Sequence, residues 1–225
     1  MRVGERPGET TKGARTRRVI LAAAISRFGR DGYRSTSVAD IAREAAVGPT
    51  AAFAYFPNKE ALFLAAVDAD AAAMIEEALS KANATSNTRE WRQAFFVGSV
   101  EALGRHPLAR RLHAGLEPDF TGRVLDVPAL TELRKGLADR LRTDQLDGQV
   151  RPDIDVDAIA NGVVAISLSL LRSVVQLGDN ATGIYAPDIA AVIEAAIDRA
   201  PPATSVRPRR RARTKTSQRN PGRRK

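Results

Sequence analysis

The sequence predicts an all-α protein, with a small N-terminal helix-turn-helix domain joined through a long helix to a larger helical domain. Three observations lead to this prediction. Apolar residues recur at spacings of three and four, and no segment alternates like a half-buried strand. Residues 38–57 have the pattern of a helix, a three-residue turn and a second helix. Charge is divided along the chain, because two basic ends flank an acidic middle.

Short-range signals define the N-terminal elements. Residues 1–13 mix glycine, proline and charge without periodicity, so we expect a flexible arm there. A helix is expected from about residue 14, since apolar residues then recur every four positions. Gly32 is the expected left-handed residue at the end of this helix. Thr36 or Ser37 is the expected cap of the next helix.

The helix-turn-helix signal depends on where small and apolar residues fall. Gly48 can cap the second helix, and Pro49 suits its first position, where no N–H partner is needed. The short turn sets the angle at which the second helix, expected to end near Tyr55, protrudes from the domain. Four residues occupy the positions where the two helices must meet: Ile41, Ala45, Val47 and Ala52.

The later helices are longer and carry no motif. Asn58 is the expected cap of a long alanine-rich helix, and the sequence after residue 200 has no core-forming run and is expected to be disordered. Residues 115–127 look irregular. The expected helices span about residues 59–82, 88–104, a short segment after Pro107, 128–146, 155–178 and 187–199.

Composition excludes several classes of protein. Cysteine is absent and there are two histidines, so neither a disulfide framework nor a metal site is expected. A glycine-rich phosphate loop and a nucleophile elbow are also missing, so we expect no cofactor and no enzymatic activity. No secretory signal is visible, and the longest uncharged apolar stretch, residues 158–171, is too short to cross a bilayer. A cytoplasmic protein is expected.

The two basic ends point to nucleic acid. The chain has a net charge of +9, and residues 201–225 carry ten Lys and Arg and no Asp or Glu. Residues 1–60 are also basic, whereas residues 61–200 are acidic. This division fits DNA contact at the ends and another role in the middle. The basic tail either adds non-specific DNA affinity or is a solvated appendage, and the sequence leaves both open.

One segment carries a specific family resemblance. The run Tyr55-Phe56-Pro57-Asn58-Lys59-Glu60-Ala61-Leu62-Phe63, together with the helix-turn-helix pattern before it, resembles the N-terminal domain of the TetR family of one-component repressors. The resemblance covers about residues 14–74. This sequence departs from the family pattern at Ala46, where a turn glycine is usual, at Gly48, where a capping serine is usual, and at Phe53, where a tyrosine is usual.

The resemblance implies a fold and a function. Residues 14–74 would form the DNA-binding domain, with the helix-turn-helix at about 37–56, and residues 75–200 a helical domain for effector binding and dimerisation. The implied protein is a homodimeric repressor, released from a palindromic operator on double-stranded DNA by a largely apolar small molecule. The alternative is an architectural protein that binds DNA through its basic ends without sequence preference.

The candidate DNA-binding residues lie on and around the second helix of the motif. Its exposed face would enter the major groove, where a threonine can hydrogen-bond and methyl groups can touch thymine. Lys59, at the start of a helix, would meet a phosphate. The full set of candidates is Arg15, Arg17, Arg18, Thr36, Ser37, Gly48, Pro49, Thr50, Ala51, Phe53, Ala54, Tyr55 and Lys59.

Candidates in the second domain are less specific. Asn161 and Arg172 interrupt an apolar helix and suit ligand or dimer contacts equally well. Small residues on the last two helices permit close approach of a second chain. The effector candidates are Trp91, Phe95, Phe96, His113, Phe120, Asn161, Ser167 and Arg172; the dimer candidates are Ala158, Gly162, Ala165, Ala190, Ile193 and Ile197.

Overall fold

The computed structural model describes residues 7–85, 88–178 and 180–198. Within these ranges the chain is helical and forms no strand; Val150 and Asp198 make an isolated bridge. The predicted all-α fold is therefore confirmed. The expected tail, residues 201–225, lies outside the described ranges. The helices are α1 (Pro7–Ser35), α2 (Val38–Glu44), α3 (Pro49–Tyr55), α4 (Lys59–Ala82), α5 (Thr88–Leu103), α6 (Pro107–His113), η1 (Pro118–Phe120), α7 (Thr121–Val124), α8 (Pro128–Leu146), α9 (Val156–Leu177) and α10 (Asn180–Ile197).

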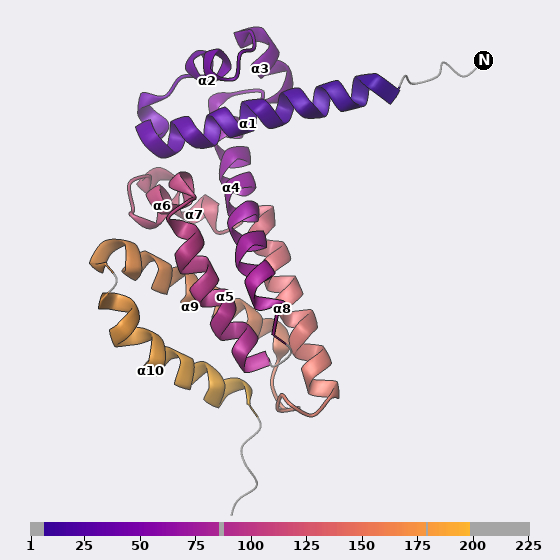
Figure 1. The fold of residues 1–225 in the computed structure, drawn as a ribbon, viewed down its shortest axis with the longest axis vertical. Helices are drawn as coiled ribbons and strands as arrows, with labels where there is room; N and C mark the ends of the chain where they lie inside the picture. The colour runs from indigo at the N-terminus through magenta and orange to yellow at the C-terminus, as the bar shows by residue number, and fades with distance from the viewer. Residues whose placement is uncertain (1–6, 86–87, 179, 199–225) are drawn as a thin grey trace, which may run out of the picture.

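The helices form two halves joined by α4 (Figure 1). Helices α1, α2 and α3 gather at one end of the molecule, and α4 runs from them into the other half. There α4 packs along α5, α8 packs on α9, and α10 packs on α9. Helix α6 contacts both α1 and α9, so it lies between the two halves.

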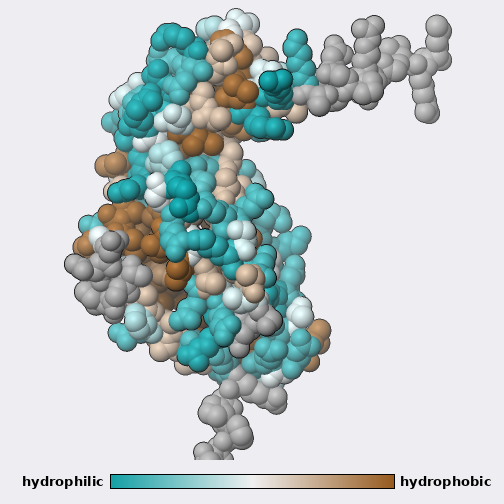
Figure 2. Space-filling model, in the orientation of Figure 1, coloured by the Kyte–Doolittle hydropathy of each residue, from teal (hydrophilic) through white to brown (hydrophobic). Residues whose placement is uncertain are grey.

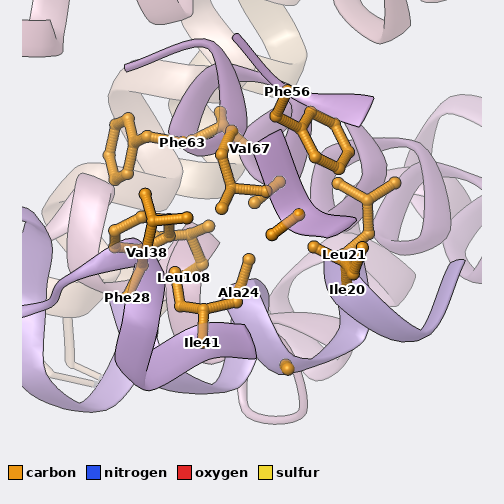
Figure 3. Packing of buried hydrophobic residues seen from close by; sticks show 14 of the residues in the cluster. Ile20, Leu21, Ala24, Phe28, Val38, Ile41, Phe56, Phe63, Val67 and Leu108 are labelled. Carbon is orange, nitrogen blue, oxygen red and sulfur yellow. The ribbon is translucent and has the colours of Figure 1, made fainter. Parts of the chain in front are cut away.

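The first half is built around one apolar core (Figure 3). Ile20 and Phe28 of α1, Ile41 of α2 and Phe63 of α4 are fully buried and converge on it. Leu108 of α6 belongs to the same core. The two halves therefore share buried side chains, instead of meeting only through the α4 backbone.

Caps set several helix boundaries. The Ser37 hydroxyl accepts from the Asp40 N–H at the start of α2, and Asn58 Oδ1 accepts from the Ala61 N–H at the start of α4. Gly32 has φ 84°, the positive value expected of this glycine, and it kinks α1 close to the end of the helix at Ser35. A Cβ at Gly32 would also lie 2.3 Å from the Arg111 guanidinium, so a substitution there would have to displace the end of that side chain as well as adopt the positive φ.

Three expected boundaries were wrong. Helix α1 begins at Pro7, so residues 7–13 are helical, because a proline suits a first helical turn and Glu9 follows it. Helix α10 begins at Asn180, so Pro187 lies inside that helix and does not start it. Two short helical turns, η1 and α7, occupy much of the segment expected to be irregular.

Helix α9 is long and strongly apolar. By length and composition alone it could cross a membrane, and 28% of its most apolar window is buried within the chain. The same composition is found in helices that pack inside helical domains, and α9 packs against α8, α10, α6 and α5. Much of one α9 face is nevertheless exposed, so it is available to a partner.

Candidate nucleic-acid interface and effector cavity

Backbone hydrogen bonds close the turn between α2 and α3. The Val47 N–H donates to the Ala42 carbonyl at 2.9 Å, and the Ala46 N–H donates to Arg43 at 3.1 Å. Ala46 has φ 53°, so an alanine occupies the left-handed conformation for which the family pattern uses glycine. The turn therefore keeps the geometry of the motif at some cost in backbone strain.

We expect Ala46→Gly to stabilise the protein. Removing the backbone strain of an alanine in the left-handed conformation should raise the free energy of unfolding by about 1–2 kcal/mol. The greater conformational freedom of glycine in the unfolded chain offsets part of this gain. A net gain of about 0.5–1 kcal/mol should appear as a higher urea midpoint. Ala73→Gly, in the exposed interior of α4, is the matched control and should cost about 1 kcal/mol. If both substitutions destabilised the protein, the account of the turn would be wrong.

Helix α3 presents an unobstructed face to solvent. Ala52 is fully buried against the core, whereas Pro49, Thr50, Phe53 and Ala54 are exposed. Phe53 is 50% exposed, which is unusual for an aromatic side chain without a partner surface. Ala51 and Tyr55 are half-buried at the edges of this face, and Gly48 caps the helix without a side chain.

Basic residues lie on α1 and at the start of α4, the helix that follows α3. Arg15, Arg17 and Arg18 of α1 are exposed, and the Arg17 guanidinium lies 5.3 Å from the centre of the Phe56 ring. The Lys59 ammonium lies 4.4 Å from the Tyr33 ring centre and donates to the Arg34 carbonyl at 3.4 Å. Partial burial lowers the pKa of Lys59 from its ordinary value. Its ammonium group is thus held in place at the start of α4.

The predicted role of Thr36 in phosphate contact was wrong. Thr36 is 2% exposed, and its hydroxyl donates to the Gly32 carbonyl at 2.8 Å. It closes the end of α1 and is not available to DNA. Ser37 is exposed but serves as the α2 cap and donates to Asp40 Oδ2 at 2.6 Å. The backbone N–H groups at the start of α2 remain available to a phosphate.

The second half contains a cavity of about 860 Å³, lined by residues of α4 to α10. Six of the eight effector candidates line it: Trp91, Phe95, Phe96, His113, Ser167 and Arg172. The walls are mainly aliphatic and aromatic, as in sites for small apolar molecules. Figure 2 shows hydrophobic side chains gathered around the end of α9, beside residues drawn in grey.

Two effector candidates are not in the cavity wall. Phe120 is buried between the two halves, with ring centroids 4.6 Å from Tyr33 and 4.4 Å from Phe63. Its apolar surface is used in this aromatic cluster. Asn161 is exposed on α9 and does not line the cavity. Sequence reasoning also missed Arg92, which lines the cavity from α5.

His113 is a neutral group in the cavity wall. Burial, and secondarily the nearby positive charge of Arg172, lowers the pKa of His113 to about 4. At neutral pH the imidazole is uncharged, so it offers a ligand one hydrogen-bond donor and one acceptor but no charge.

The cavity wall is directly connected to the DNA-binding half. Thr121, Val124 and Leu125 line the cavity immediately after Phe120, which packs on Tyr33. Just before Phe120, Glu117 Oε1 accepts from the Tyr33 N–H at 3.0 Å and from Arg111 Nε at 2.6 Å. A shift of this wall would therefore move the end of α1.

A second connection joins α4 to α6. Asp70 of α4 is 4% exposed, and its Oδ2 accepts from the Ala109 N–H at 2.9 Å. Its Oδ1 lies 2.8 Å from His106 Nδ1. Since Ala109 also lines the cavity, this carboxylate links a cavity wall to the helix that carries the DNA-binding half.

The dimer candidates divide into three groups. Ala158, Gly162 and Ala165 are exposed on one face of α9. Ala190 and Ile193 are half-buried and line the cavity, as Ala165 also does. Ile197 is fully buried within its own chain, where it packs with residues of α5, α8 and α9, so it is removed from the candidate interface.

The geometry defines a helix-turn-helix protein with an attached helical domain that contains a cavity. A sequence profile described as "Bacterial regulatory proteins, tetR family" matches residues 20–66. Residues 20–66 are therefore similar to the DNA-binding segment of TetR-family regulators. The curated relative YuxN of Bacillus subtilis (strain 168), an uncharacterized HTH-type transcriptional regulator, is 45% identical over 47 residues. That match spans 21% of this chain and 16% of the relative.

Solved structures extend the similarity of fold over most of the chain. A transcriptional regulator assigned to the TetR family, from Mesorhizobium loti MAFF303099, matches with a TM-score of 0.63 at 18% identity, covering 83% of this chain and 98% of its own. The fatty acid degradation regulator FadR from Bacillus halodurans matches with a TM-score of 0.58 at 16% identity, covering 86% of this chain and 94% of its own. At these identities the likeness concerns the fold.

Proposed function

We propose that the protein is a homodimeric transcriptional repressor that a small apolar effector releases from a palindromic operator. The observation that carries this proposal is the exposed face of α3, where Pro49, Thr50, Phe53 and Ala54 stand clear of the core. A helix that protrudes with one free face is the element that enters the DNA major groove in helix-turn-helix proteins.

Recognition would combine few hydrogen bonds with apolar contact and DNA shape. Thr50 can bond a base edge, while Ala54 and Phe53 offer carbon surface to thymine methyl groups. The exposed α3 face has no Arg, Asn or Gln, so we expect no bidentate hydrogen bonds from this face to the bases. Lys59 and the α1 arginines would position the domain on the phosphates.

Dimerisation would use the exposed face of α9. Ala158, Gly162 and Ala165 provide a surface of small residues on which a second copy of α9 can approach closely. On α10, Val192 is 65% exposed and adds apolar area. A two-fold dimer would place two α3 helices about 34–36 Å apart, one DNA turn.

Effector binding would oppose DNA binding through the cavity wall. An occupied cavity would displace the segment around Phe120, the Asp70 link on α4, or both, and so change the spacing of the two α3 helices. Coupling of this kind is typically ~1–3 kcal/mol, and it acts in both directions.

Two substitutions test sequence-specific DNA recognition. Thr50→Val should lower the ratio of specific to random DNA affinity by about fivefold, the value of one ordinary hydrogen bond. Lys59→Gln should weaken both affinities alike and reduce the salt dependence by about one unit. The measurement is a salt titration of binding to operator and random duplexes, with the unfolding midpoint of each variant as a control. Equal losses on both duplexes for Thr50→Val, or no preference in the unsubstituted protein, would favour the architectural alternative.

A further inference from the structure

Arg92 is a buried cation in the cavity wall with an unsatisfied donor. Its side chain is 10% exposed, and its Nη2 donates to Asp198 Oδ1 at 3.1 Å. Its Nη1 is buried and has no hydrogen-bond partner among the described residues. A buried guanidinium donor without an acceptor is destabilising, so the site favours a ligand that supplies one.

Asp198, the ion-pair partner of Arg92, does not provide an acceptor for Nη1. Asp198 follows α10 and its side chain is 42% exposed, so its carboxylate remains largely solvated. It bonds only one of the two terminal nitrogens of the arginine. Because a guanidinium presents several N–H donors in a planar fork, a second carboxylate can be bound once the side chain turns the buried Nη1 toward the cavity.

The charge around the cavity also favours an anion. Its described ionisable lining consists of Arg89, Arg92, Arg172, Glu194 and the neutral His113. Glu194 is paired with Arg89 at 2.6 Å. When Asp198 is counted with these side chains, their net charge remains positive. An alkylammonium ligand would therefore be disfavoured, and a carboxylate favoured.

An apolar wall lies next to this cation. Trp91 and Phe95 stack with their ring centroids 5.5 Å apart, and Phe96, Leu168 and Ile193 also line the cavity. The volume of about 860 Å³ is within the range that accommodates drug-sized apolar molecules. The site thus combines a hydrocarbon-binding space with one buried cation.

We propose that the effector cavity binds amphipathic carboxylates, with Arg92 holding the carboxylate and the aromatic wall holding the hydrocarbon. This proposal rests on the proposed function of the cavity as an effector site, and it adds the chemical class of the effector. Arg92 is its specificity-determining residue, and the carboxylate is recognised by a charge-assisted hydrogen bond.

The test compares three ligands with the same hydrocarbon chain: decanoate, decanol and decylamine, each below its micelle-forming concentration. Trp91 is the one tryptophan in the chain and lines the cavity, so its fluorescence reports binding to delipidated full-length protein. Decanoate should bind at least about tenfold tighter than decanol, and decylamine should bind weakest. Equal binding of decanoate and decanol would overturn the proposal.

The matched variants are Arg92→Met and Arg110→Met. Arg92→Met keeps the aliphatic volume, and Asp198 stays solvated, so the variant should bind decanol normally and bind decanoate no better than decanol. Arg110 is exposed on α6 outside the cavity, so its substitution should keep the full preference. A preference retained in Arg92→Met would overturn the proposal, and the ligand series on the unsubstituted protein decides the question if this variant does not fold.

A DNA-release assay separates this inference from the proposed function. If decanoate binds through Arg92 but does not release DNA, the carboxylate site stands and effector release fails. If decanol releases DNA and decanoate does not, effector release stands and the carboxylate site fails.

Discussion

Ala54→Glu should lower the affinity for operator DNA at least about a hundredfold while leaving the helical fold intact. Ala54 is exposed on α3 and makes no core contact, so the substitution has little effect on folding. In the proposed complex the new carboxylate would lie in the major groove between two phosphate backbones. Juxtaposed like charges at an interface cost several kcal/mol, which corresponds to such a loss. Fluorescence anisotropy with a labelled operator measures it.

Ala73→Glu is the control for this prediction, because it distinguishes repulsion inside the groove from the effect of a changed net charge. Ala73 is exposed on α4 and is also helical, so this variant alters charge and helix composition in the same way as Ala54→Glu. It should retain affinity within a few-fold, because Ala73 lies in the part of α4 that has run away from α3 into the other half. Comparable losses in the two variants would mean that α3 does not enter the groove.

Gly162→Arg should convert the proposed dimer into monomers. Gly162 is exposed on α9, and a Cβ built there meets nothing within 4 Å in its own chain. Arginine favours helix more than glycine by about 1 kcal/mol, so the monomer itself should become no less stable. A large cation placed in a close helix contact between two copies would prevent their approach. Sedimentation should show a monomer, and affinity for a palindromic site should fall with it.

Gly136→Arg is the control for this prediction. Gly136 is also exposed and helical, on α8, and its Cβ would likewise meet nothing within 4 Å. It lies outside the proposed interface, so this variant should remain dimeric. If Gly162→Arg stayed dimeric as well, the exposed face of α9 would not be the interface.

The fold was predictable from the sequence because its signals are local. Ser37 and Asn58 act as caps, and Gly32 adopts a positive φ near the end of α1, as expected from their chemistry alone. Helices α3, α4 and α8 begin and end where apolar spacing and proline placement predict. The start of α10 was missed because a proline usually marks a first turn, whereas Pro187 lies inside this helix.

The sites were less predictable because they depend on contacts between distant segments. Glu117 and Tyr33 are 84 residues apart, and nothing local indicates that the segment around Phe120 docks on α1. Periodicity identifies an apolar face but does not distinguish a cavity wall from a core, so Ile193 was assigned to a dimer interface. Arg92 resembles a surface charge on an amphipathic helix, and only its burial distinguishes it.

Selection of bound sequences from a random DNA pool tests the central claim most directly. The delipidated dimeric fraction of the full-length protein would be used at about 150 mM salt, where non-specific contacts are weakened. The account predicts enrichment of a palindrome whose half-site centres lie one helical turn apart, about 10–10.5 base pairs. A folded, ligand-free dimer that enriches no sequence would contradict it.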